Sequence, residues 1–298
     1  MPFRSSTPPV SDLSGVNIVP FEVGYLTPHF EKKAESENDT SETRTRCIQE
    51  LKDVIIQEGD DTIRHIKFSD DFLLQHLRTR KFDVRRCLKS LTQFISLTLK
   101  FPEMFQNFCF DATSRGVRDG IVTFLPWRCQ DGCIILYVQI SNWHLEEFPM
   151  EEVKRMLVVM LTQAMRDPMT QVNGIKTIID IKGFNFKHLK QCTPHNLWLL
   201  YHATQNCVPG RYKQIHIVNY HLLFLSVWLC VKQFMSKKLQ DRVHFHTSPK
   251  KLFDFFPSEC IPAKYGGQLV VEDQTEWLRK MMTPEELAYI GGGALNPI

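Results

Sequence analysis

The segment from Ile175 to Asn219, IKTIIDIKGFNFKHLKQCTPHNLWLLYHATQNCVPGRYKQIHIVN, decides the fold. It begins and ends with short runs rich in β-branched residues, which are typical of buried strands. Between these runs, Thr193 and Pro194 predict the start of a helix, as N-cap and first-turn proline. Two strands joined by a helix of this length predict a parallel pair with a crossover connection.

The same alternation continues on both sides of this segment. Upstream, the runs IVTFLPWR (121–128) and CIILYVQI (133–140) flank a turn that contains Asp131 and Gly132, which predicts a hairpin. Downstream, an apolar helix is expected at LLFLSVWLCV (222–231) and a short strand at VHFH (243–246). The sequence therefore predicts an α/β fold with a mostly parallel sheet.

Composition divides the chain into four parts. Residues 1–45 are rich in Pro, Ser and charge and are predicted to be a disordered tail. Residues 46–115 are predicted to form an N-terminal helical domain, in which Ser69 caps a helix. Residues 116–270 contain the alternating strands and helices, and residues 271–298 are expected to be a C-terminal extension.

Charge and cysteine content restrict the partners and the compartment. A net charge of +3 over 298 residues argues against a broadly basic surface that binds nucleic acid. Nine cysteines without a C-x-x-C pair favour reduced thiols over a disulfide framework. The N-terminus lacks the apolar core of a secretory signal, and the longest apolar run is about half of the roughly 20 residues that span a membrane. We therefore expect a cytoplasmic protein.

Catalytic and metal-binding motifs give little support for an enzyme. The sequence has no dinucleotide-binding, P-loop, nucleophile-elbow or H-E-x-x-H motif, so no enzymatic activity is predicted. His244 and His246 alternate on one short strand, but no cysteine or carboxylate lies at a suggestive spacing, so no metal site is predicted. Asp180, near a strand end, is interpreted as a turn or capping group rather than an acid/base group.

The apolar helix at 222–231 is followed directly by cations. One interpretation is an ordinary core helix; the other is a helix with one face on an apolar cavity and the other able to enter a bilayer. Lys238 and Arg242 are spaced i, i+4, and Arg211 and Lys213 enter a strand whose parallel neighbour brings them close. Two such pairs suit a multiply charged phosphate headgroup, which favours the second interpretation.

Five ordered motifs show that the chain resembles the CRAL-TRIO family from about Ser69 to Leu269, and especially its tocopherol- and retinaldehyde-binding branch. The motifs are DDFLLQHLRTRKFDVRRCLKSL, NGIKTIIDIKGFNF, PGRYKQIHIVN, FMSKKLQDRVHFH and IPAKYGGQL. The resemblance implies a helical domain followed by an α/β cage with a mobile apolar gate helix. The cage is expected to hold a hydrophobic lipid and to need no cofactor.

The resemblance also implies three sets of site residues. Phosphatidylinositol bisphosphate is expected to bind at Arg211, Lys213, Lys238 and Arg242. The lipid pocket is expected at Leu157, Leu161, Ile175, Ile179, Phe186, Leu200 and Thr204. The gate, within 222–234, is expected to use Leu223, Phe224, Val227, Trp228 and Val231.

One departure from the family concerns the cargo. The tocopherol branch has serines where this chain has Leu157 and Leu161, which implies a drier pocket and disfavours tocopherol itself. The expected function is an intracellular carrier that exchanges a tocopherol-, retinoid- or similar lipid at phosphoinositide-containing membranes, with which it associates reversibly. Two alternatives stay open, a lipid-sensing adaptor without net transport and an enzyme that acts on lipid esters.

Overall fold

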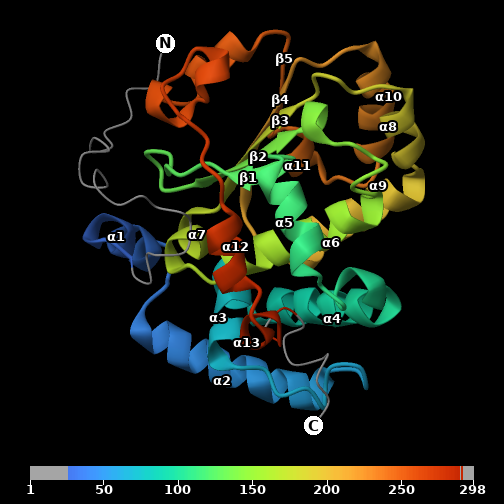
Figure 1. Ribbon diagram of the computed structural model, residues 1–298. Coiled ribbons are helices and arrows are strands. Elements are labelled where there is room, and N and C mark those ends of the chain that lie inside the picture. The colour runs from blue at the N-terminus through green and yellow to red at the C-terminus, as the bar shows by residue number, and fades with distance from the viewer. Residues whose placement is uncertain (1–25, 289, 291–298) are drawn as a thin grey trace.

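The computed structural model describes residues 26–288 and residue 290 (Figure 1). A helical N-terminal part lies on one side of an α/β unit and leads into it through α4. The N-terminal helices are α1 (Pro28–Ser36), α2 (Ser41–Glu58), α3 (Asp70–Thr79) and α4 (Val84–Lys100).

The structure corrects the predicted tail. Helix α1 and the first turn of α2 occupy residues 28–45, and Phe30 and Ala34 of α1 are buried against Met169 and Val172. The prediction of a disordered tail is therefore wrong for this stretch, and residues 1–25 lie outside the described residues. Only two residues of α1 are buried, which is why composition gave no signal for this helix.

The sheet has five strands in the order β1-β2-β3-β4-β5. Strand β1 runs antiparallel to β2, which confirms the predicted hairpin, and the other three pairs are parallel. The fold is thus the predicted α/β class with a mostly parallel sheet. The strands are β1 (Val122–Phe124), β2 (Ile134–Gln139), β3 (Ile175–Asp180), β4 (Tyr212–Val218) and β5 (Val243–His246).

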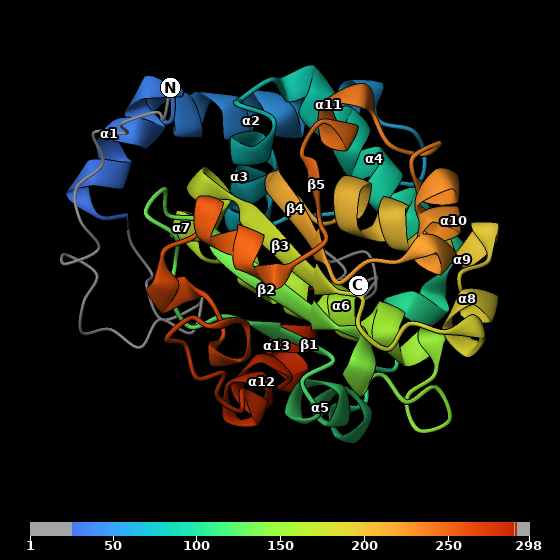
Figure 2. The same cartoon turned by 90° about the horizontal axis from the view of Figure 1, so that it is seen from above.

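Helices cover one face of the sheet and a C-terminal segment covers the other. Figure 2 shows α8, α9 and α10 together on one side of the strands, and α10 packs on both α8 and α9. On the opposite face, Ile178 packs with Leu252 and Phe256. The remaining helices are α5 (Phe110–Arg118), α6 (Met150–Ala164), α7 (Pro168–Asn173), α8 (Phe186–Gln191), α9 (Pro194–His202), α10 (Leu222–Val231), α11 (Lys237–Gln240), α12 (Thr275–Met281) and α13 (Pro284–Ala288).

Local capping explains where the helices begin. The Ser69 hydroxyl accepts a hydrogen bond from the backbone N–H of Phe72, and the Thr193 hydroxyl accepts one from Asn196. Each such cap typically stabilises a helix by about 1 kcal/mol. A π-helical turn (Ala203–Cys207) follows α9 and completes the connection to β4.

The C-terminal residues return to the edge of the sheet. The backbone N–H of Phe124 donates to Oε1 of Gln274 at 3.1 Å, and the Gln274 amide donates back to the Phe124 carbonyl. Trp277 and Leu278 of α12 are buried in the main core. This segment therefore braces strand β1, at the edge of the sheet away from α10.

Candidate functional site

A cavity of about 320 Å³ lies between the sheet and helices α6, α9 and α10. The sheet contributes Ile179, Ile215 and Ile217 to its wall, and α10 contributes Val227 and Trp228. No described residue that lines the cavity carries a charge. An ionised ligand group would therefore be buried without a partner, which is costly, so the cavity suits an uncharged apolar molecule.

Four of the seven expected pocket residues lie on this cavity wall: Leu157, Ile179, Leu200 and Thr204. Leu161 and Ile175 are fully buried but pack in the main core and do not reach the cavity. Leu161 lies on α6 and Ile175 lies on β3. Both elements do line the cavity, but four residues away, through Leu157 and Ile179. Their expected place in the pocket is therefore wrong in this structure.

The expectation for Phe186 is also wrong, because its side chain is 71% exposed. Asn185 caps α8 by accepting hydrogen bonds from the N–H groups of Lys187 and His188. This places Phe186 at the first helical position, facing solvent. Phe184, just before the cap, lines the cavity instead, and its ring packs edge-on against Phe224 at 5.6 Å.

Helix α10 separates the cavity from the surface. Its residues Phe224, Val227, Trp228 and Val231 lie on the cavity wall, whereas Leu223 packs beside the cavity without lining it.

On the outer side of α10, Leu222 is 85% exposed and Leu229 is 53% exposed. Only Val227 is buried within this helix, although nine of its ten residues are apolar. An ordinary core helix would bury most of these side chains. The helix is therefore a thin apolar wall with an unpartnered outer face.

The four expected headgroup ligands lie around the starts of β4 and β5. Arg211 and Lys213 flank Tyr212 on β4, and Nη1 of Arg242 donates to the Tyr212 carbonyl at 2.5 Å. Burial lowers the pKa of Lys213, and the positive charge of Arg211 adds to this shift. Lys238, in α11, is exposed and forms no ion pair within the described part of the chain. We call these four residues the cationic cluster.

Arg211 differs from the other three because a carboxylate already holds it. Its Nη1 lies 2.5 Å from Oε2 of Glu37, just after α1, and the Arg211 side chain is only 12% exposed. Burial alone would raise the pKa of Glu37, but Arg211 and Lys81 outweigh it and lower that pKa. Glu37 is the main residue that the sequence analysis missed, because it lay inside the expected tail.

Asp180 has a structural role that fits its interpretation as a turn residue. It accepts hydrogen bonds from Nδ2 of Asn219 at 2.8 Å, from the Lys182 N–H at 3.0 Å and from the Tyr265 hydroxyl. Lys264 adds an ion pair at 3.4 Å. These partners anchor the end of β3 to the segment before the C-terminal extension.

The histidines of β5 also have a structural explanation. Nδ1 of His216 lies 3.0 Å from Nε2 of His246, and the ring of His244 stacks on His216. Burial lowers the pKa of His216 to about 3, so its ring is neutral at physiological pH. Within residues 26–288 and residue 290, no group of three or more His, Cys, Asp or Glu is arranged to hold a metal ion.

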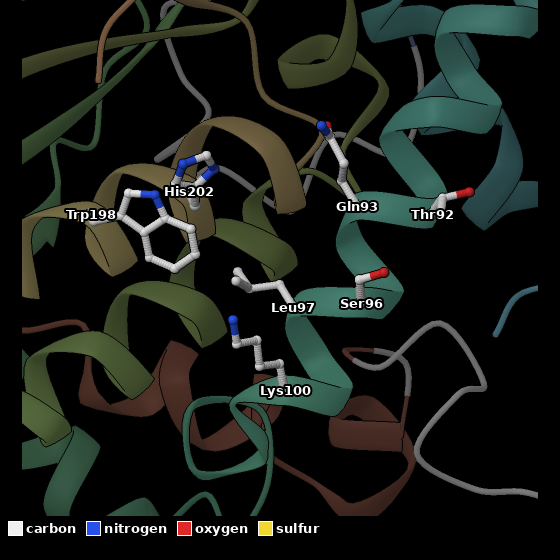
Figure 3. A pocket seen from close by; sticks show the side chains of 7 residues that line it. All are labelled: Thr92, Gln93, Ser96, Leu97, Lys100, Trp198 and His202. Atoms are coloured by element: carbon white, nitrogen blue, oxygen red, sulfur yellow. The ribbon is translucent and has the colours of Figure 1, made fainter. Parts of the chain in front are cut away.

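A second, smaller crevice of about 280 Å³ lies between α4 and α9 (Figure 3). Leu97 and Lys100 of α4 face Trp198 and His202 of α9 across it. Leu200, on the same α9, lines the main cavity instead. Helix α9 therefore lines both the crevice and the main cavity. The crevice lies where the N-terminal helices contact the α/β unit.

No described helix is long and apolar enough to cross a membrane. If α10 meets a bilayer, it does so as a short surface helix of ten residues.

Comparisons with known proteins identify the family and several relatives of this chain. The model of the family described as CRAL/TRIO domain matches residues 118–267. Clavesin-2 of Mus musculus is 28% identical over 266 residues, which cover 87% of this chain and 80% of that protein. Alpha-tocopherol transfer protein-like of Mus musculus is 29% identical over 263 residues, which cover 88% of this chain and 76% of that protein.

A solved structure described as "Crystal structure of Sfh5" matches with a TM-score of 0.49 and 12% identity, covering 84% of this chain and 95% of that chain. The family match spans half of the sequence and contains every strand of the sheet and helix α10. The chain therefore belongs to the CRAL/TRIO family of lipid-binding proteins.

Proposed function

We propose that this protein carries a small uncharged lipid and exchanges it at membranes that contain phosphatidylinositol bisphosphate. The observation that carries this proposal is the charge-free cavity closed by α10, a helix whose outer face is also apolar. Family membership supports lipid binding, and the name of the relative alpha-tocopherol transfer protein-like supports transfer. In this proposal the protein catalyses no reaction.

The domain assignment that accompanies this proposal keeps the expected boundaries. We propose residues 46–115 as the helical domain, 116–270 as the lipid-binding cage and 271–298 as an extension, in which Gln274 and α12 brace the cage.

The size of the cargo's apolar surface explains why a membrane is needed. A lipid that buries roughly 500 Å² of apolar surface gains about 12 kcal/mol on entering the cavity. Escape into water would then be very slow. If α10 moves aside while its outer face lies in a bilayer, the cargo passes from one apolar environment to another, and most of this barrier disappears. We therefore assign α10 the role of a mobile gate.

The cationic cluster determines where the gate opens. Lys238 lies in α11, which follows the gate in the chain, Arg242 comes just before β5, and Lys213 lies at the start of β4. Diffuse attraction to an anionic membrane contributes about 1 kcal/mol for each cation. Three such contributions give only a weak, millimolar-scale association. Directed hydrogen bonds to a phosphorylated headgroup must supply the remainder. Because such headgroups face the cytoplasm, we propose a cytoplasmic protein that visits membranes reversibly.

The cavity also indicates the class of cargo. Its charge-free wall disfavours ionised fatty acids, and Leu157 replaces a hydroxyl where the tocopherol branch has a serine. We propose a neutral, tocopherol- or retinoid-like molecule with little polar surface.

Native mass spectrometry of protein purified from its own tissue tests this assignment. A single neutral lipid bound in a 1:1 ratio is the expected result. An ionised fatty acid as the bound species would contradict the proposed cargo class. A bound neutral lipid that never leaves to acceptor vesicles would favour a lipid-sensing adaptor over a carrier.

A further inference from the structure

Glu37 forms an ion pair with Arg211, one of the four residues of the cationic cluster. Its Oε2 lies 2.5 Å from Nη1 of Arg211, and its Oε1 lies 3.4 Å from Nζ of Lys81. The Glu37 side chain is 22% exposed and the Arg211 side chain 12% exposed. A headgroup phosphate cannot reach this guanidinium while the carboxylate is in place.

Other contacts hold the segment that carries Glu37. Helix α1 is anchored by the burial of Phe30 and by a hydrogen bond of 2.6 Å from Lys33 to Asn173. On the other side of Glu37, Asp39 forms a buried ion pair with Arg78 at 2.9 Å. The backbone around Glu37 is thus fixed from both sides. The carboxylate can swing away from Arg211 without undocking α1.

Arg211 is likewise held in position without Glu37. Its guanidinium donates to the Val172 carbonyl at 3.1 Å and to the Arg78 carbonyl. Its Nε–H is buried and has no hydrogen-bond partner within residues 26–288 and 290. Two backbone carbonyls therefore hold the guanidinium in position. Of its partners, only the Glu37 carboxylate can be replaced by a ligand, and the Nε–H donor is still unused. Phosphate oxygens bind the same guanidinium and bring more charge and more acceptors than a carboxylate.

We propose that Glu37 is an internal competitor that occupies the phosphate site at Arg211 until a multiply phosphorylated headgroup displaces it. This inference rests on the proposed function, since it concerns the same headgroup site. In solution, Lys213, Lys238 and Arg242 make the first encounter, and Arg211 joins after the exchange. A singly charged headgroup such as phosphatidylserine gains too little to displace Glu37, so the competition sharpens selectivity for phosphoinositides.

The test compares Glu37→Gln with Glu35→Gln, a matched control. Glu35 lies two residues away on α1, is exposed, and forms no ion pair within the described residues. Binding is measured to phosphatidylcholine vesicles that contain phosphatidylinositol bisphosphate, or phosphatidylserine at equal total charge. Glu37→Gln should raise affinity for the phosphoinositide vesicles about tenfold, which corresponds to about 1.4 kcal/mol. Glu35→Gln should change it less than twofold.

A second pair of variants isolates Arg211. In the natural sequence, Arg211→Ala should weaken phosphoinositide binding less than threefold, because the guanidinium is already engaged. In the Glu37→Gln background, the same change should remove the whole gain. The gain should also appear in calorimetry with soluble inositol trisphosphate, since the competition is for phosphate itself. A gain confined to vesicles would overturn the proposal.

Other outcomes separate this inference from the proposed function. If the natural protein binds phosphoinositide vesicles selectively but Glu37→Gln weakens or does not change that binding, Glu37 is only a structural partner of Arg211 and the inference fails alone. An equal gain on phosphatidylserine vesicles also overturns it, because general charge would then explain the effect. If the natural protein shows no preference for phosphoinositide vesicles, the proposed headgroup site itself is wrong.

Discussion

The outer face of α10 allows the sharpest prediction about transfer. Replacing Leu222 and Leu229 by serine removes two apolar side chains that are 85% and 53% exposed in solution. Full burial of a leucine side chain contributes about 2 kcal/mol, so the two exposed portions correspond to about 1.7 and about 1.1 kcal/mol on entering a bilayer. The double variant should therefore bind and unload at vesicles about 100-fold less well.

In the absence of membranes the same change should have little effect, because Leu222 is almost fully exposed and only the inner part of Leu229 loses packing. The midpoint of thermal unfolding and the affinity for cargo in solution should match those of the natural protein. The assay follows a fluorescent neutral lipid from loaded protein to acceptor vesicles.

A matched control comes from elsewhere on the surface. Leu99 on α4 is 52% exposed and Val270 is 72% exposed, and both lie outside the gate. Leu99→Ser combined with Val270→Ser should leave transfer unchanged. If both double variants slow transfer equally, or if the α10 variant unfolds, the outer face has no special role and the reasoning is refuted.

Two further predictions concern the cations and a buried histidine. Lys238→Ala with Arg242→Ala should weaken binding to phosphoinositide vesicles by more than the roughly 1 kcal/mol expected per diffuse charge. The control, Lys250→Ala with Lys251→Ala, should not exceed that value. Equal losses in the two double variants would indicate a general positive patch. Burial lowers the pKa of His76 to about 3, so below about pH 6.5 the unfolded chain binds a proton that the folded one does not. His76 should therefore contribute a fall of about 1.4 kcal/mol per pH unit to the free energy of unfolding between pH 6.5 and 3. His216, whose pKa burial also lowers to about 3, adds a fall of its own, so His76→Leu should remove only its share of the slope in urea titrations. An unchanged slope would show that His76 is not the group responsible.

Local sequence signals predicted the fold well because they act over a few residues. The caps at Ser69 and Thr193 and the turn at Asp131 and Gly132 each determine where an element begins or ends. The β-branched runs between them are short enough to be strands and apolar enough to be buried. Together these signals were sufficient for the α/β class, the hairpin and the parallel pairs.

The site was harder to predict because it depends on contacts between distant segments. Leu157 and Leu161 share a helix face, yet only Leu157 reaches the cavity, because the main core fills the space one turn further along. Phe186 was expected in the pocket, but the N-cap at Asn185 places it in the first turn of α8, where it faces solvent. Phe184, just before the cap, lines the cavity instead.

Glu37 shows the same limit of sequence reasoning at longer range. It lies 174 residues from Arg211 in the chain. No local pattern connects the two, because the pair forms only when α1 docks beside α7. Composition instead assigned the whole stretch to a tail.

The central claim is that a phosphoinositide at the membrane surface triggers release of cargo through α10. The most direct measurement is the rate at which protein loaded with a neutral lipid delivers it to acceptor vesicles with phosphatidylinositol bisphosphate, compared with vesicles that carry the same charge as phosphatidylserine. We expect delivery to be at least tenfold faster to the phosphoinositide vesicles, because only that headgroup forms directed bonds beside the gate. Equal rates to the two kinds of vesicle would contradict the account.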